Sequence, residues 1–288
     1  MTYYQFIHAV EEKIKKEVKE ERKISVHTNI KNNGVKRTGI MISENGINIS
    51  PTIYLEEYFQ QFKRGYPLEL IVKDILSLYE KIRFQNSWKE GEKVKSYDFV
   101  KGRIIYRLVN RERNRKLLED VPYKEYLDLA IVYYVLLEMD EYGMASMLVR
   151  REHLKMWKVS EEDIYYRACK NTQKLLPYDF STMRSVIMEL LEIGREIEEQ
   201  TGKMYILSNV MRSYGACAMM YPDLLRKIGE ELEENSVHET IIVAESEAPG
   251  KEELCEMIEE INETQVEEEE VLSNRAYYYE CDTGKLLF

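Results

Sequence analysis

The chain has 288 residues, of which 44% are hydrophobic and 32% charged, and its formal net charge is −11. This composition is ordinary for a globular protein of about two domains and excludes collagen-like and low-complexity classes. No apolar run approaches the roughly 18 residues that a membrane span needs, and the acidic total argues against sequence-independent binding to duplex nucleic acid.

The first predicted element is an amphipathic helix over residues 2–22, in which apolar side chains recur at helical spacing. Two Asn-Gly pairs, Asn33-Gly34 and Asn45-Gly46, follow it. Asn-Gly is the preferred sequence of tight hairpin turns because both central residues need a positive φ. We therefore expect a three-stranded antiparallel meander over 23–31, 35–43 and 47–50, with the first helix covering its apolar face.

Two more helices complete the predicted first domain. Ser50-Pro51 is a good helix start, and Gly65 ends that helix. Pro67 opens the next one, whose apolar stripe runs to residue 82. The polar stretch 86–95 is the predicted boundary. The domains are then 1–90, an α-βββ-αα unit, and 95–288, either one α+β domain or two lobes over 95–180 and 181–288.

The middle of the chain begins with a basic stretch, which we interpret as an amphipathic helix over 97–118, with a strand over 102–110 as the alternative. The apolar run 127–140 predicts a buried strand, because it is rich in β-branched and aromatic residues. Residues 144–157 predict a second strand running into a loop, so the two strands form a hairpin. Ser160, followed by three acidic residues, predicts the start of a helix that Pro177 closes.

The C-terminal third predicts further small units of sheet and helix. The expected elements are a helix over 181–200, a strand over 204–209 with a partner over 214–221, a helix from Pro222, a strand over 236–244, a helix over 251–266 and a final hairpin. The predicted fold class is α+β, with small antiparallel sheets and packed helices.

Cysteine and charge patterns bear on location and partners. The four cysteines, at positions 169, 217, 255 and 281, are widely spaced and include no C-x-x-C pair. They predict free thiols in a reducing cytoplasm, with neither a zinc site nor a disulfide framework.

Residues 1–120 carry 24 Lys and Arg against 17 Asp and Glu, whereas the remainder carries 17 Lys and Arg against 35 Asp and Glu. This asymmetry indicates a basic binding face or two parts that attract each other.

His238-Glu239 is the sharpest candidate for catalysis, because a histidine beside a carboxylate can act as a general base or bind a metal. The sequence lacks H-E-x-x-H, however, and neighbours on a strand point to opposite faces, which favours a structural pair. A hydrolase or nuclease would place its site near His238, Glu239 and the turn Asn209–Tyr214. Phosphate-binding loops and the nucleophile elbow are absent from the sequence, so no cofactor or metal is predicted.

An arginine-rich segment, residues 103–116, is the candidate binding element. Guanidinium groups suit phosphate and carboxylate, and the nearby aromatic residues could stack on bases of single-stranded nucleic acid. The alternative is a solvated helix face. The candidate binding residues are Arg103, Arg107, Arg111 and Arg113.

Several short motifs together resemble an uncharacterised protein family, a domain of unknown function from clostridial gut bacteria, over essentially the full chain. They include residues 31–34, 49–56, 109–114, 127–130, 171–172, 208–209, 221–222 and 238–239. The resemblance implies a bacterial accessory protein and brings no activity with it. Our main hypothesis is a non-enzymatic interaction or regulatory protein of the bacterial cytoplasm with a protein partner. The alternatives are the hydrolase or nuclease and the nucleic-acid-binding protein.

Overall fold

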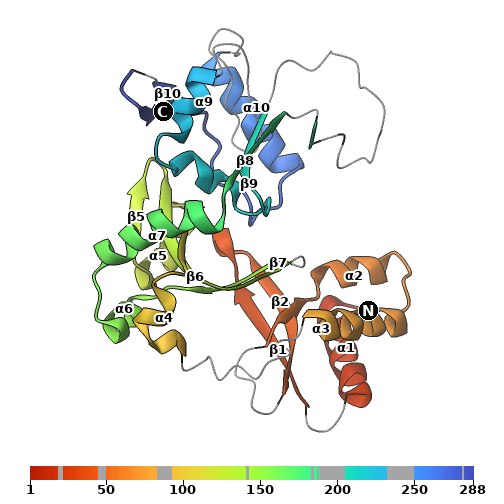
Figure 1. The fold of residues 1–288 in the computed structure, drawn as a ribbon. Coiled ribbons are helices and arrows are strands. Elements are labelled where there is room, and N and C mark those ends of the chain that lie inside the picture. Colours follow the sequence, from red (N-terminus) through yellow and green to blue (C-terminus); the bar gives the residue numbers. More distant parts are fainter. Residues whose placement is uncertain are drawn as a thin grey trace. The chain divides into compact units, whose positions relative to one another are not determined.

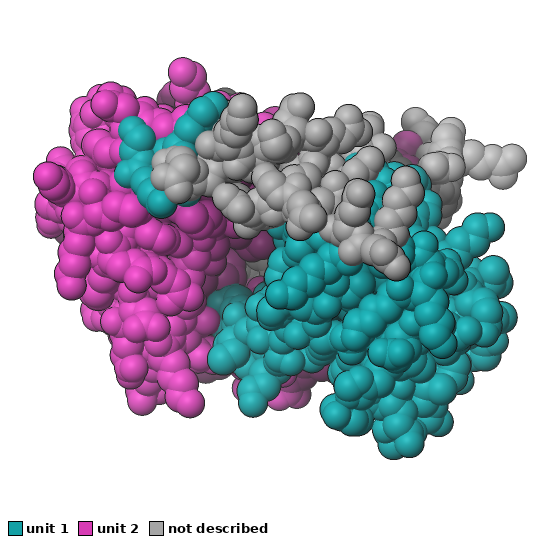
Figure 2. Space-filling model, turned by 90° about the horizontal axis from the view of Figure 1, so that it is seen from below, with its two compact units in different colours: residues 1–96 teal, residues 97–288 magenta. Residues whose placement is uncertain are grey.

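The computed structural model divides into two compact units, residues 1–96 and residues 97–288 (Figures 1 and 2). It describes residues 1–18, 22–44, 50–82, 93–140, 143–182, 185–186, 188, 205–231, 250–280 and 282–288. The α+β class is confirmed, with an N-terminal helix, a three-stranded antiparallel sheet and further small sheets. Domains 1–90 and 95–288, as parts that fold independently, stay a prediction.

Unit 1 packs three helices against one antiparallel sheet (Figure 1). Its elements are α1 (Tyr3–Glu17), β1 (Arg22–Ile30), β2 (Lys36–Glu44), β3 (Thr52–Tyr54), α2 (Glu56–Lys63) and α3 (Leu68–Ile82), with a 3₁₀ turn η3 (Lys93–Lys95). The sheet order is β1-β2-β3. Thr2 caps α1 by accepting the amide of Gln5, whose side chain in turn accepts the amide of Thr2.

The core of unit 1 is apolar throughout its described residues. Phe6, Val10 and Ile14 of α1 are fully buried against Ile71 and Ile75 of α3 and the inner face of the sheet. The alternation predicted for the first strand places Ile24 and Val26 against this core. Helix packing on one sheet face therefore follows the pattern that the sequence predicted.

The first Asn-Gly turn is confirmed, and the described third strand of the sheet is β3, Thr52–Tyr54. Asn33 and Gly34 have positive φ of 58° and 75° in the 3₁₀ turn η1 (Asn32–Gly34) between β1 and β2. The second turn and most of the strand predicted over 47–50 lie outside the described residues. The helix predicted from Pro51 was wrong at its start, because Thr52–Tyr54 forms β3 and α2 begins at Glu56.

β3, which begins directly after Pro51, packs closely against β2. Its buried Ile53 pairs with Ile40 of β2. A Cβ at Gly39 would lie 2.6 Å from Thr52 Cγ2 and 2.7 Å from the Ile53 carbonyl oxygen. Glycine at this position therefore allows the two backbones to approach closely.

Unit 2 is built around the long strand β6 (Leu129–Asp140). β4 (Ile104–Asn110) pairs with one side of β6, and β5 (Tyr123–Tyr126) and then β7 (Gly143–Leu148) pair with the other, all antiparallel. The predicted β6–β7 hairpin is thus confirmed. The short helix α4 (Tyr97–Val100) precedes β4, α5 (Arg115–Asp120) connects β4 to β5, and α6 (Arg151–Trp157) follows β7. α6 replaces the loop that we expected there.

The helix predicted over 97–118 was wrong, and the alternative strand is correct. Six of the seven residues of β4 are buried, including Ile104, Ile105 and Tyr106. A strand buried on both faces carries a nearly continuous apolar run, which over a short stretch is indistinguishable from a helical stripe.

α7 (Glu161–Leu175) starts at the predicted cap Ser160 and packs on β4 (Figure 1). Beyond it lie β8 (Tyr178–Thr182), β9 (Tyr205–Asn209), η4 (Gly215–Met220), α9 (Leu224–Glu231), α10 (Lys251–Thr264), β10 (Tyr278–Glu280) and β11 (Lys285–Leu287). The predicted strand before residue 210, the helices near 222 and 251, and the final hairpin are confirmed. None of the described helices is long and apolar enough to cross a membrane.

Two C-terminal predictions were wrong in part. The helix predicted over 181–200 begins inside β8, and most of its remaining residues lie outside the described part. Residues 214–221 contain the 3₁₀ helix η4 instead of a strand, because β8 already pairs with β9. The strand predicted over 236–244 lies outside the described residues.

Candidate recognition site

The turn Asn209–Tyr214, which follows β9, is held by one buried amide side chain. Asn209 is fully buried; its Oδ1 accepts the Met211 amide at 2.9 Å and its Nδ2 donates to the Ser213 carbonyl at 2.8 Å. The Asn209 carbonyl also accepts the Arg212 amide at 2.8 Å. Asparagine thereby supplies both a donor and an acceptor inside the turn, which fixes its shape.

Two residues of the turn adopt the left-handed backbone conformation without being glycine. Arg212 has φ of 45° and Tyr214 has φ of 57°. Such conformations are uncommon for bulky residues, cost of order 1 kcal/mol or more, and are concentrated at functional sites. The turn is therefore rigid and under local strain.

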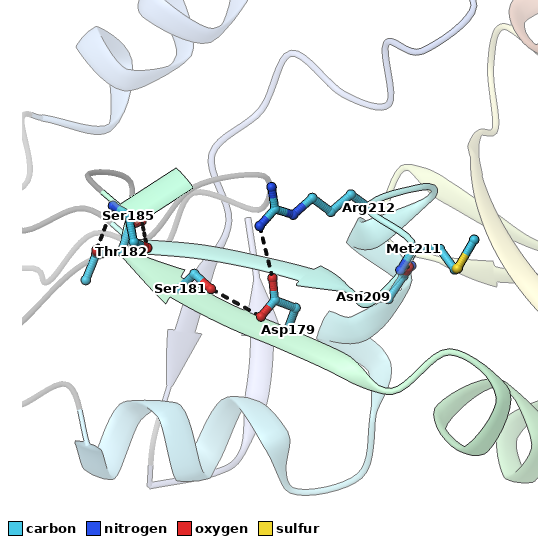
Figure 3. A network of polar contacts seen from close by, with 7 residues as sticks. All are labelled: Asp179, Ser181, Thr182, Ser185, Asn209, Met211 and Arg212. Atoms are coloured by element: carbon cyan, nitrogen blue, oxygen red, sulfur yellow. Dashed lines mark hydrogen bonds and ion pairs between the residues drawn. The ribbon is translucent and has the colours of Figure 1, made fainter. Parts of the chain in front are cut away.

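The turn exposes apolar and aromatic surface next to a charged pair. Val210 is 57% exposed, Tyr214 53% and Tyr178, which pairs with Asn209 across the hairpin, 51%. Arg212 Nη2 lies 3.9 Å from Asp179, and Figure 3 shows its side chain reaching back over β9 while Met211 points the other way. An open hollow of about 410 Å³ lies among Asp179, Val210, Met211 and Arg212.

Polar contacts on β8 support one wall of this hollow. Ser181 donates a hydrogen bond to Asp179 at 3.1 Å, and Thr182 contacts Ser185 (Figure 3). Asp179 is thus held between a hydroxyl on its own strand and the guanidinium of Arg212. The positive charge of Arg212 is accordingly balanced by the negative charge of Asp179.

The same turn contacts a buried arginine on β4. Arg107 is 7% exposed, and its Nη2 donates to Ser146 of β7 at 2.8 Å. Its guanidinium carbon lies 3.7 Å from the ring centre of Tyr214 and 4.1 Å from that of Tyr134 on β6. Both distances are in the range of cation–π contacts. Arg107 Nε is buried and has no hydrogen-bond partner in the described part of the chain.

A buried thiol lies beside this arginine. Cys217 is 2% exposed, its Sγ lies 3.6 Å from the Tyr106 carbonyl, and burial raises its pKa to about 11. A thiol that stays protonated at neutral pH is a poor nucleophile. Cys217 therefore serves packing, as predicted for a buried free thiol.

The other arginines of the predicted binding segment are dispersed. Arg103 precedes β4 and contacts Phe99, with its guanidinium carbon 5.0 Å from the ring centre. Arg111 follows β4 and pairs with Glu125 at 2.6 Å, and exposed Arg113 lies in the next turn. At the rise of a strand, Arg103 and Arg111 are roughly 25 Å apart. The structure therefore brings none of these three to the Arg107 site.

The remaining sequence candidates fall outside the described residues, because His238 and Glu239 lie in the stretch 232–249. Among the residues that are described, no group of three His, Cys, Asp or Glu could hold a metal ion. Sequence reasoning missed Tyr178 and Val210 as surface residues. The sequence indicated the turn Asn209–Tyr214 only as a neighbour of His238, and the Ser208-Asn209 pair only as part of a resemblance.

Structural roles account for several motifs behind the family resemblance. Asn171 of α7 donates to the Lys101 and Ile104 carbonyls, and Thr172 accepts the Tyr106 amide at 3.0 Å. These two side chains cover the outer edge of β4. Asp128 accepts hydroxyl hydrogen bonds from Ser273 and Tyr277, which ties the C-terminal segment to β6.

The comparisons with known proteins agree with this resemblance and add no activity. No curated protein and no solved structure matches the chain significantly. The model of one family, described as DUF5688, a family of unknown function, matches residues 3–281. Because this match spans nearly the whole sequence, the chain belongs to the DUF5688 family of unknown function.

Proposed function

We propose that this protein is a non-enzymatic binding protein of the bacterial cytoplasm, which recognises a protein partner through the turn Asn209–Tyr214. The observation that carries the proposal is a rigid turn that exposes Val210 and Tyr214, both more than half exposed. Surfaces fixed in advance lose little conformational entropy on binding. The free thiols of Cys169, Cys217 and Cys255 support a reducing compartment.

The side chains around the turn are of the kinds that dominate binding energy in protein interfaces. Tyrosine and arginine are enriched among such residues, and they cluster with apolar contacts that exclude water. Tyr178, Val210, Arg212 and Tyr214 supply this combination on one hairpin. An origin in gut clostridia stays a prediction.

A surface substitution on the turn tests the proposal. Tagged full-length protein is cross-linked in host extract, with nuclease added, and partners are quantified by mass spectrometry. We expect Val210→Asp to lower recovery of a specific partner by about tenfold or more, since burying an unpaired carboxylate costs well over 1.4 kcal/mol. Ile30→Asp, at a residue 71% exposed in unit 1, is the matched control and should leave recovery unchanged. Equal recovery with both variants would reject the turn as the interface.

The alternative functions are less well supported. A nucleic-acid surface on residues 103–116 would need neighbouring cations, whereas Arg103 and Arg111 lie at opposite ends of β4 and Arg107 is buried. The double variant Arg103→Glu, Arg111→Glu tests it: a loss of nucleic acid recovered without nuclease would favour it. The hydrolase or nuclease site at His238 and Glu239 remains a hypothesis that His238→Ala would test.

A further inference from the structure

Among the arginines that the structure describes, Arg107 is the one whose side chain is buried. Its side chain is 93% buried, given an exposure of 7%, and no ion pair of the described residues includes it. The guanidinium stays protonated in proteins, so it cannot relieve this burial by losing a proton. The cation–π contacts to Tyr134 and Tyr214 compensate only part of the lost hydration.

One donor of this guanidinium is unused. Nη2 donates to Ser146, and Nε is buried without a hydrogen-bond partner among the described residues. A buried unpaired donor is rare in folded proteins and calls for a specific explanation. Nε and Nη2 lie on the same side of a guanidinium, where a carboxylate binds with two parallel hydrogen bonds. The orphan donor therefore lies where one oxygen of an anion would be placed.

The ring of Tyr214 covers one face of this guanidinium. Tyr214 is the exposed member of the pair that contacts Arg107, and its backbone belongs to the strained turn Asn209–Tyr214. A shift of this one ring would open the guanidinium to a ligand bound on the turn. The exposed Val210 offers apolar contact for the rest of that ligand, and the hollow of about 410 Å³ beside it offers mainly polar contact.

The charges nearby select the kind of anion. Arg212 is already paired with Asp179, so Arg107 supplies a single uncompensated positive charge. A single charge matches a carboxylate better than a phosphate dianion. Unit 2 as a whole carries 24 Lys and Arg against 39 Asp and Glu, which repels polyanions such as nucleic acid.

We propose that Arg107 is a carboxylate-binding residue, which takes the side chain of an Asp or Glu from the partner protein when that partner binds the turn. This inference rests on the proposed function and names the chemistry of the partner's contact residue. Ser146 shares the carboxylate with Arg107, and Tyr214 moves aside and then packs on the bound segment.

The test uses full-length protein labelled with ¹⁵N-arginine, in which the Nε–H signal of Arg107 is assigned by its absence from Arg107→Lys. The probes are N-acetylglutamate and N-acetylglutamine, both as α-N-methylamides so that only the glutamate side chain carries a charge, and inorganic phosphate. We expect a saturable shift of the Arg107 signal with N-acetylglutamate and binding of N-acetylglutamine weaker by about tenfold or more, the loss for one charge-assisted hydrogen bond. Arg111→Lys, at an exposed ion pair, is the control variant and should preserve the response.

Three outcomes would overturn the inference: no shift of the Arg107 signal, equal shifts with the two amino-acid analogues, or tighter binding of phosphate than of N-acetylglutamate. A second measurement is independent of binding. Arg107→Met should keep or raise the urea midpoint, because replacing a buried charge held for ligand binding removes a destabilising group. A lowered midpoint would mean that Arg107 serves stability instead.

The two proposals can fail separately. If Val210→Asp abolishes partner recovery while N-acetylglutamate does not shift the Arg107 signal, the turn is an interface and the carboxylate inference is wrong. If the signal responds while no partner depends on Val210, Arg107 binds a carboxylate and the proposed protein interface is wrong.

Discussion

The two units differ in the polarity of the side chains that form their interiors. Unit 1 buries apolar side chains only, whereas every buried polar or charged residue of the described chain lies in unit 2. These residues are Arg107, Asn114, Thr172, Ser208 and Asn209. Apolar packing tolerates many substitutions, but a buried polar group must find its partner in one geometry.

This difference indicates where function is placed. All five buried polar side chains of unit 2 belong to β4, α7 or β9 or to the turn that follows β4. Asn209 holds the turn Asn209–Tyr214, and Arg107 contacts it through Tyr214. Among the described residues of unit 1 no polar side chain is fully buried, although the partly buried Glu56 accepts the Thr38 amide and the Tyr3 hydroxyl. We therefore expect the stability of unit 1 to depend on the volume of its buried apolar side chains. The stability of unit 2 should depend in addition on hydrogen bonds such as those of Asn209 and Thr172.

The largest expected effect is a cavity in unit 1. Phe6 is fully buried, with its ring centre 5.3 Å from that of Phe59, and Phe6→Ala should cost about 3–5 kcal/mol of unfolding free energy. Hydrogen exchange followed by mass spectrometry should report lost protection in peptides of unit 1 and unchanged protection in unit 2. Tyr4→Ala, at a residue 70% exposed, is the control. Equal losses in both units would mean that they unfold as one.

The next effect is the loss of the amide that holds the turn. Asn209→Ala leaves the Met211 amide and the Ser213 carbonyl unpaired, and should cost about 2–3 kcal/mol in urea unfolding. Asn209→Asp keeps the acceptor and loses the donor, so an intermediate cost is expected. If neither Asn209→Ala nor Asn209→Asp lowers the free energy of unfolding, the Asn209 side chain does not hold the turn. The proposed contrast between the two units would then be wrong.

Sequence reasoning was most successful where structure is local. The Asn33-Gly34 turn and the Ser160 cap depend on a few neighbouring residues, and both were predicted correctly. β4 was ambiguous, because arginines four residues apart, at 103, 107 and 111, resemble the polar face of a helix. The strand is favoured by pairing with β6, a contact that no local pattern encodes.

The candidate site was only half predictable for the same reason. Arg107 was chosen from its chemistry, but its burial depends on Tyr214, which is distant in sequence. The turn Asn209–Tyr214 was named, although as a neighbour of His238. The hydrogen bonds of Asn209 hold its shape, which includes left-handed Arg212 and Tyr214, residues that propensity does not place in that conformation.

A smaller effect is expected at the edge of β4. Thr172→Val removes the acceptor of the buried Tyr106 amide with little change of shape, and should cost about 1–2 kcal/mol of unfolding free energy. Thr172→Ser keeps the hydroxyl and should cost less. Amide exchange of Tyr106 should speed up in the valine variant alone. Identical exchange in both variants would mean that another group satisfies this amide.

The smallest effect concerns pH and His153 of α6. Its Nδ1 accepts the Arg150 amide at 3.0 Å, and its ring lies on Trp157 with centres 5.4 Å apart. Burial lowers the pKa of His153 below its usual value. The unfolded chain therefore takes up the proton first, and stability should fall as pH drops through about 6.5, until the folded state also binds it.

The substitution His153→Gln keeps an acceptor for the Arg150 amide and removes the titration. Its urea midpoint should consequently change less between about pH 7.5 and about pH 5.5 than that of the unmodified protein. Equal changes would assign the pH dependence to other groups. Because the Arg150 hydrogen bond and the Trp157 ring contact of this histidine both lie within α6 or its cap, such a result would leave the contrast between an apolar unit 1 and a polar unit 2 to be decided by Asn209 and Thr172.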